Sequence, residues 1–234
     1  MEDIRRDLTQ LARSIERIPS RSGGRQVMVI GTDPDVRASS VSASLALLMS
    51  GRSTKSTWLI DLDLLESPVF YAFQSNLFHR TGRPGRAFDG SLNTRQFYNV
   101  VPELRAREGR TQARPKMLGV HQIDGTRLMV SRFRTELLKQ GQRVQINGTP
   151  DFWQALRNAS DWAIVDAPAL DDSRAGLAVC RHMDGVIIVV QADKTYVDEI
   201  SGLRDEIEAH GGHCLGVVVN GVKADARFAD RIAL

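Results

Sequence analysis

The chain has 234 residues, of which 42% are hydrophobic and 25% charged, a balance that excludes a wholly disordered chain and suits one α/β domain. Its net charge of +3 and sequence pI near 9.1 fall short of the dense positive charge of a dedicated nucleic-acid binder. Because no apolar run approaches the ~20 residues that span a bilayer, and the N-terminus is charged, the sequence predicts a cytoplasmic protein. Its two cysteines, Cys180 and Cys214, lie in or beside apolar runs and are expected to be free thiols.

The first expected element is a helix within residues 2–17. Four apolar residues at spacings of four, three and four form one stripe along it: Ile4, Leu8, Leu11 and Ile15. Such a stripe has to be buried, so we expect residues 1–18 to be a helix that docks on the domain or joins copies of the chain. A turn-rich linker leads from it into a single domain over residues 19–234.

Short aliphatic runs of strand length alternate with helical patterns along the rest of the chain. The runs cover residues 27–30, 57–60, 162–165, 186–190 and 215–219, and the helical patterns include 39–49, 149–158 and 196–210. Continuous apolar runs are typical of a parallel sheet that is covered on both faces. The sequence therefore predicts an α/β fold with a doubly wound, mostly parallel sheet flanked by helices, as in P-loop NTPases.

One stretch, residues 70–127, departs from this pattern because its periodicity is weak and it is rich in arginine. Between residues 80 and 116 it holds nine basic and three acidic residues, an excess of six. One interpretation is a solvated loop with a short helix or two, because runs of charge usually lie at the surface. The other is a basic insertion that contacts anionic lipid or an acidic protein.

Polar residues follow the predicted strands at the edge where open parallel sheets bind ligands. The first strand is followed by GTDPDVRASSVSASLALL, which includes the hydroxyls of Ser39 and Ser40, and later strands are followed by Asp61 with Asp63, and by Asp166. A P-loop wraps glycine backbone around phosphates and adds a lysine and a magnesium-binding hydroxyl. This chain has the strand, the loop, the serines and the small-residue helix, but lacks the glycines and the lysine.

These motifs resemble those of the bacterial tyrosine kinases that partner polysaccharide co-polymerases, within the partition-type P-loop ATPases. The resemblance covers nearly the whole chain and is carried by GTDPDVRASSVSASLA, LIDLDLLESP, DWAIVDAPA, MDGVIIVV and LGVVVNGV. It implies an ATP- and magnesium-dependent site. In that site Ser39 matches the magnesium-binding hydroxyl, Asp61 and Asp63 the second acidic pair, Asp166 the Walker B aspartate, and Asn220 the residue near the adenine. Ser39, Asp61 and Asp166 would be the magnesium ligands when nucleotide is bound.

The phosphate loop departs from the family pattern at the positions that matter for catalysis. Ala38 falls on the Walker lysine, Arg37 on the preceding glycine, and Asp35 on another loop residue, in a loop about two residues short. The missing lysine removes a cation that phosphoryl transfer requires. The chain also ends without the family's cluster of tyrosines. No catalytic residue is therefore assigned, Asp61, Asp63 and Asp166 are interpreted as vestigial, and neither ATP nor magnesium is expected as a resident cofactor.

The leading hypothesis is a degenerate, non-enzymatic relative: a cytoplasmic scaffold or regulator of exopolysaccharide or capsule biosynthesis and export. Its expected partner is the cytosolic tail of an inner-membrane co-polymerase or export protein, which would place it peripherally at that membrane. Self-assembly through the N-terminal helix is a further expectation, because Glu2 and Arg5 match the family's ring-forming helix although Leu8 replaces its last arginine.

Two alternatives stay open. One is a weakly active ATPase or tyrosine kinase in which Arg37 replaces the lysine and Ser39, Ser40 and Asn220 help to bind nucleotide, because a guanidinium can grip phosphate. The other is a partition-type protein that binds nucleic acid through the basic insertion, which the modest net charge disfavours.

Overall fold

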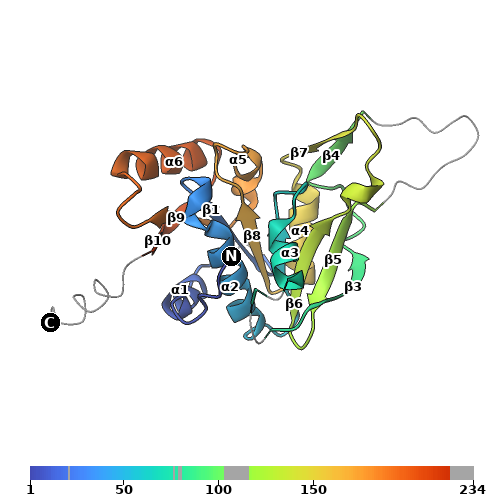
Figure 1. Cartoon of the computed structure of the whole chain (residues 1–234), viewed down its shortest axis with the longest axis horizontal. Coiled ribbons are helices and arrows are strands. Elements are labelled where there is room, and N and C mark those ends of the chain that lie inside the picture. The colour runs from blue at the N-terminus through green and yellow to red at the C-terminus, as the bar shows by residue number, and fades with distance from the viewer. Residues whose placement is uncertain (21, 76, 79–80, 103–115, 222–234) are drawn as a thin grey trace, which may run out of the picture.

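The computed structural model describes the chain except residues 21, 76, 79–80, 103–115 and 222–234. Its centre is an eight-stranded sheet with helices on both faces (Figure 1). In spatial order the strands are β10 (Cys214–Asn220), β9 (Gly185–Gln191), β1 (Arg25–Gly31), β8 (Trp162–Ala167), β2 (Thr57–Asp61), β6 (Leu128–Phe133), β5 (Leu118–Ile123) and β3 (Pro84–Asp89). Neighbours from β10 to β6 are parallel, and β5 and β3 are added antiparallel. The predicted doubly wound, mostly parallel sheet is confirmed.

Two apolar cores lie on opposite faces of this sheet. One is covered by α1 (Thr9–Ile15), α2 (Ala38–Ser50) and α3 (Pro68–Gln74), and the other by α4 (Pro150–Ala159), α5 (Ala175–Val179) and α6 (Val197–Ala209). The central strands β8 and β2 are buried at every residue, which explains why their sequences are apolar without alternation. Three short 3-10 helices complete the described elements: η1 (Pro34–Val36), η2 (Thr135–Leu137) and η3 (Cys180–His182).

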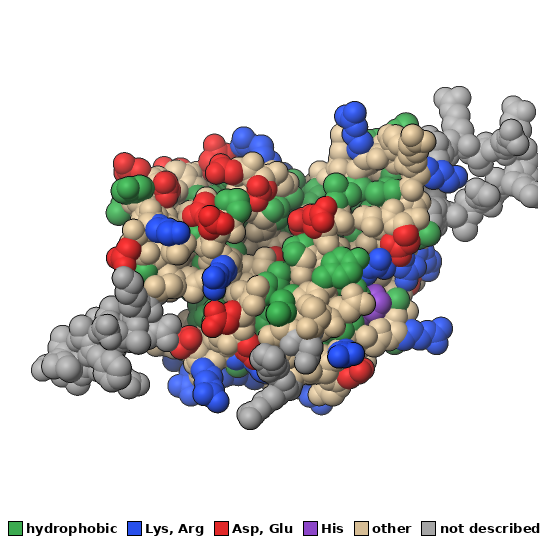
Figure 2. Space-filling model, in the orientation of Figure 1, with side chains coloured by type: hydrophobic (Ala, Val, Ile, Leu, Met, Phe, Trp, Pro, Cys, Tyr) green, Lys and Arg blue, Asp and Glu red, His purple; other side chains and the backbone are tan. Residues whose placement is uncertain are grey.

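The arginine-rich stretch forms more regular structure than a solvated loop. It supplies β3 and β5 at the antiparallel end of the main sheet, and β4 (Tyr98–Val101), which pairs with β7 (Arg143–Ile146) in a separate two-stranded sheet. The interpretation as a solvated loop is therefore wrong for the described part of this stretch. The strand β3 was hard to recognise in the sequence because it is a half-exposed edge strand that carries charged residues. Lys and Arg side chains gather at this end of the molecule (Figure 2). Residues 103–115 of the stretch lie outside the described part.

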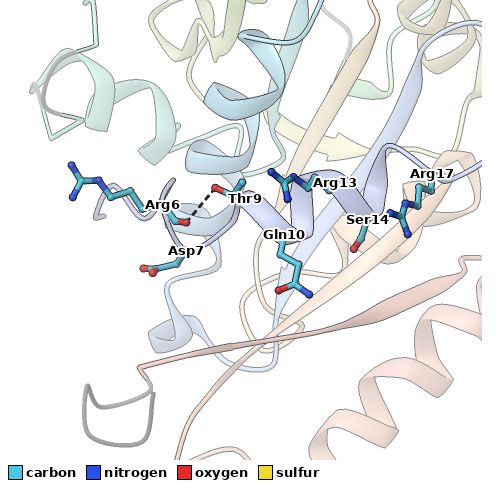
Figure 3. A pocket seen from close by; sticks show the side chains of 7 residues that line it. All are labelled: Arg6, Asp7, Thr9, Gln10, Arg13, Ser14 and Arg17. Atoms are coloured by element: carbon cyan, nitrogen blue, oxygen red, sulfur yellow. Dashed lines mark hydrogen bonds between the residues drawn. The ribbon is translucent and has the colours of Figure 1, made fainter. Parts of the chain in front are cut away.

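The N-terminal helix is shorter than expected, and its apolar stripe is buried within its own chain. Residues 5–8 form turns because the Asp3 carboxylate accepts the backbone and side-chain N–H groups of Arg5, which competes with helical hydrogen bonding. Leu8, Ala12 and Ile15 are buried in the core beneath α1, which packs on α2. The outward face is a shallow depression (Figure 3) lined only by polar and charged residues: Arg6, Asp7, Thr9, Gln10, Arg13, Ser14 and Arg17. Self-assembly through α1 would therefore have to use polar contacts.

Two smaller findings bear on expectations from the sequence. Both cysteines are free thiols, Cys180 buried and Cys214 half-buried, as predicted. Among the helices that the structure describes, none combines the length and apolar character that crossing a membrane requires.

Candidate functional site

The phosphate-loop position is a tight turn between β1 and α2. The Asp33 carboxylate accepts the N–H of Asp35 at 2.8 Å, which starts the one-turn helix η1. Arg37 then adopts a left-handed conformation with φ of 59°, and α2 begins at the next residue. The turn is held from outside by the Asn220 amide, which donates to the Val36 carbonyl at 3.0 Å. The loop is thus fixed by its own turn and by the end of β10.

A valine side chain packs into the inside of this turn. Val36 is 1% exposed, and its Cγ2 lies 2.5 Å from the point where a Cβ on Gly31 would be, so only glycine fits at position 31. The Asp33 carbonyl lies 2.9 Å from the same point. A P-loop surrounds phosphate oxygens with its backbone N–H groups. In this chain the loop folds tightly over Gly31, and Val36 belongs to the apolar core beneath α2.

Two buried carboxylates lie beside the start of α2. Asp166 is the last but one residue of β8 and Asp61 the last of β2, and the two residues are register partners on adjacent parallel strands. Ser39 Oγ donates to Asp166 Oδ2 at 2.7 Å, and Ser42 Oγ donates to Asp166 Oδ1 at 2.5 Å. The structure therefore brings together the three predicted magnesium ligands, Ser39, Asp61 and Asp166.

Asp61 is satisfied by backbone rather than by hydroxyl groups. Its Oδ1 accepts the N–H of Asp63 at 3.0 Å and its Oδ2 accepts the N–H of Val69 at 3.1 Å, in the first turn of α3. With the two serines on Asp166, all four carboxylate oxygens have neutral donors. The pair therefore holds its negative charge without a cation among these partners.

Burial raises the pKa of both carboxyl groups. The pKa of Asp166 rises to about 6, although the hydroxyls of Ser42 and Ser39 oppose the rise by stabilising its ionised form. The pKa of Asp61 is raised well above its usual range, first by burial and then by the neighbouring charge of Asp166. The site therefore favours a proton on one of the two carboxyls and disfavours a second negative group nearby.

The remaining predicted site residues lie away from this pair. The hydroxyl of Ser40 accepts the backbone N–H of Glu2 at 2.9 Å instead of facing Asp166. The Arg37 side chain is 65% exposed, and its Nη1 lies 3.5 Å from Glu2 Oε2. Asn220 holds the loop backbone, as described above, and its Oδ1 accepts the N–H of Gly221. The N-terminal segment thus occupies two groups that were predicted to bind nucleotide.

Asp63 and Ser42 differ from what the sequence suggested. Strand β2 ends at Asp61, so Asp63 lies in the turn that follows, where its Oδ1 accepts the N–H of Glu66 at 3.1 Å. Its charge contributes to raising the pKa of both Asp61 and Asp166. Ser42 was missed, although it stands three residues after Ser39 on the same helix and therefore on the same face.

The side chains around the acid pair suit magnesium better than they suit a triphosphate. Hydroxyl and carboxylate oxygens suit magnesium, but no group of three or more His, Cys, Asp or Glu residues could hold a metal in the described part of the chain. On the phosphate side the loop offers the carboxylates of Asp33 and Asp35, the packed side chain of Val36, and alanine at position 38. These residues do not fit a triphosphate in the way that a P-loop holds it.

Comparisons with known proteins place the fold. No protein-family model matches the chain, and no curated protein sequence matches it. Among solved structures, it is similar to the kinase domain of the Escherichia coli tyrosine kinase ETK, with a TM-score of 0.58 and 16% identity over 93% of this chain and 75% of that one. The VpsO kinase domain gives 0.57 and 16% over 94% of both chains, and the BceF tyrosine kinase domain 0.52 and 15% over 93% and 75%. This chain therefore has the fold of bacterial tyrosine kinase domains.

Proposed function

We propose that the chain is a catalytically degenerate relative of the bacterial tyrosine kinases, acting as a cytoplasmic scaffold or regulator of exopolysaccharide or capsule biosynthesis and export. One observation carries the proposal: the two buried acids and their serine donors are in place, whereas the loop packs Val36 against Gly31 and has alanine where the lysine would stand. The kinase-like fold supports the relationship at the level of architecture.

Electrostatics supports the proposal that phosphoryl transfer is inefficient. This chemistry depends on cations that neutralise the phosphates in the transition state. Two unit charges about 4 Å apart interact by about 4 kcal/mol near a protein surface. With alanine at the lysine position, a bound triphosphate would lose an attraction of that order. The carboxylates of Asp33 and Asp35 in the loop would repel its phosphates.

The proposed partner is the cytosolic tail of an inner-membrane polysaccharide co-polymerase or export protein, which would hold the chain peripherally at the membrane. A scaffold needs a stable fold and a binding surface but no turnover. Co-purification with the cytosolic ends of such membrane proteins tests this part of the proposal. Failure to co-purify with any of them would contradict it.

We expect weak or undetectable nucleotide binding. A fluorescent ATP analogue titrated with magnesium should give a Kd weaker than about 100 µM, which corresponds to about −5.5 kcal/mol. ATP hydrolysis and self-phosphorylation should stay at background. Hydrolysis that Asp166→Ala abolishes would show that the site is active and would overturn the proposal.

A variant that restores the P-loop residues should gain nucleotide affinity in the same titration. Val36→Gly, Arg37→Gly and Ala38→Lys together empty the turn and return the missing cation, so nucleotide affinity should rise by at least about tenfold, or 1.4 kcal/mol. The control Ser75→Lys places a lysine at an exposed position outside the loop and should leave affinity unchanged.

One observation favours the alternative of a weakly active enzyme that uses Arg37. Its guanidinium is largely exposed, and its ion pair with Glu2 is a surface contact, the kind that contributes about 1 kcal/mol or less. It can therefore be released at little cost. If nucleotide binds tighter than about 100 µM and Arg37→Ala removes that binding, this alternative replaces the scaffold proposal.

A further inference from the structure

The apolar stripe of α6 continues past the core into solvent. Its members, Tyr196, Ile200, Leu203 and Ile207, are spaced by four, three and four residues and therefore share one face. Ile207 is fully buried and Leu203 is 6% exposed, but Tyr196, at the N-cap, is 74% exposed. Its neighbour Val197 is 75% exposed. The start of α6 thus presents apolar surface that nothing in the described chain covers.

Strand β10 leaves apolar side chains exposed on the α6 face of the sheet. Val217 and Val219 pair in register with Ile188 and Val190 of β9, which belong to the core on the α6 face of the sheet. Partners in a parallel pair point to the same face, yet Val217 is 44% and Val219 54% exposed. We call Tyr196, Val197, Val217 and Val219 the α6–β10 surface.

The helix that borders this surface is strongly acidic. Its first turn carries Asp198 and Glu199, and its second half carries three acids that pair with arginines, Glu206 with Arg174, and Asp205 and Glu208 with Arg204. In the space-filling view Asp and Glu side chains gather over α6, whereas Lys and Arg gather at the other end of the molecule (Figure 2). An apolar surface beside acidic groups attracts a ligand that is both apolar and cationic.

We propose that the α6–β10 surface binds a basic segment of a partner protein, whose apolar side chains cover Tyr196, Val197, Val217 and Val219 while its Lys or Arg side chains face the acids of α6. The proposal rests on the proposed function. Cytoplasmic segments next to membrane spans are enriched in Lys and Arg, so the tail of an inner-membrane protein has the required chemistry. Because β10 is the terminal strand of the sheet and pairs on one side only among the described residues, its outer edge also offers backbone groups to an extended segment.

A rival occupant has the same chemistry within this chain. Residues 222–234 follow directly after β10 and include Lys223, Arg227 and Arg231 together with Phe228 and Ile232. They lie outside the described part of the structure. The experiment therefore has to separate a partner from the chain's own C-terminal residues.

The test uses the full chain and two labelled synthetic peptides of equal length. One contains Lys and Arg among Leu and Phe, and the other carries Glu in place of each Lys and Arg. The basic peptide should bind at least about tenfold more tightly than the acidic one, and its affinity should fall with salt. Tyr196→Ser with Val197→Ser should weaken binding at least about tenfold, and Asp198→Asn should weaken it severalfold.

Two control variants and a chain that lacks residues 222–234 show whether the peptide binds the α6–β10 surface. Leu65→Ser, at a residue 56% exposed elsewhere, and Asp124→Asn, an exposed acid on the β5–β6 turn, should leave affinity unchanged. Equal loss in both sets, or equal binding of both peptides, would overturn the proposal. So would binding that appears only after removal of residues 222–234, because the chain would then cover its own surface. The nucleotide assays judge the proposed function separately, since neither peptide takes part in them.

Discussion

Replacing Asp184 with alanine is expected to lower the free energy of unfolding by about 3 to 5 kcal/mol, the cost of leaving a buried charge without its partner. Asp184 Oδ2 lies 2.6 Å from Arg157 Nη1, and the side chains are 1% and 4% exposed. The same oxygen accepts the N–H of Gln26 at 2.8 Å. Arg157 also donates to the carbonyls of Gly24 and His182, so the pair ties α4 to the starts of β1 and β9. Urea unfolding of the variant and of the unaltered chain measures the difference.

A surface pair provides the matched control for this prediction. Arg132 and Glu136 also form an ion pair, at 3.0 Å, but the Glu136 side chain is 51% exposed. Glu136→Gln should therefore change the unfolding free energy by less than about 1 kcal/mol. Replacing Arg157 by leucine together with Asp184→Ala should recover part of the loss, because no uncompensated charge then remains. A cost below about 1 kcal/mol for Asp184→Ala would show that water screens this pair.

The parallel half of the fold follows from local sequence, whereas the antiparallel half does not. Strands β1, β2, β8 and β9 are mostly apolar because helices cover both faces of the sheet there, and such a run can be recognised without knowing its partner strand. Strand β10 is equally apolar in sequence, although Val217 and Val219 are exposed. Strands β3 and β5 pair across residues 90–117, a non-local contact, and β3 carries the charges of an edge strand. Strands β6 and β7 were not anticipated for a similar reason, since each gains its partner only in the folded sheet.

The sequence predicts which acids and serines form the candidate site, but it does not predict how the loop between β1 and α2 packs. Asp61 and Asp166 stand at strand ends, so topology alone brings them together with Ser39. The packing of Val36 against Gly31, by contrast, depends on how a short loop folds in three dimensions. The pair Arg157–Asp184 joins residues 27 apart through the core, and no spacing pattern marks it.

The two buried carboxyls should make the folded chain less stable as pH rises. An Asp whose folded pKa is raised binds its proton more tightly folded than unfolded, so its stabilising effect is present below the unfolded value near 3.9 and is lost as pH rises through the folded value. For Asp166, with a folded pKa of about 6, the loss should extend from about pH 4 to pH 6. At about 1.4 kcal/mol for each unit of pKa, it amounts to about 3 kcal/mol.

Asp166→Asn removes this effect together with the part of the Asp61 shift that the Asp166 charge causes. The difference in unfolding free energy, variant minus unaltered chain, should therefore rise by at least about 3 kcal/mol between pH 4 and pH 7, in addition to any pH-independent cost of the amide. Ser42→Ala removes a hydroxyl that stabilises the ionised form, so the fall in stability should extend to higher pH, whereas the exposed Ser75→Ala should not shift it. A flat difference for Asp166→Asn would mean that Asp166 ionises as readily folded as unfolded. Ionisation of Asp166 would then not lower the stability of the folded chain, and burial of the acid pair would not make stability depend on pH.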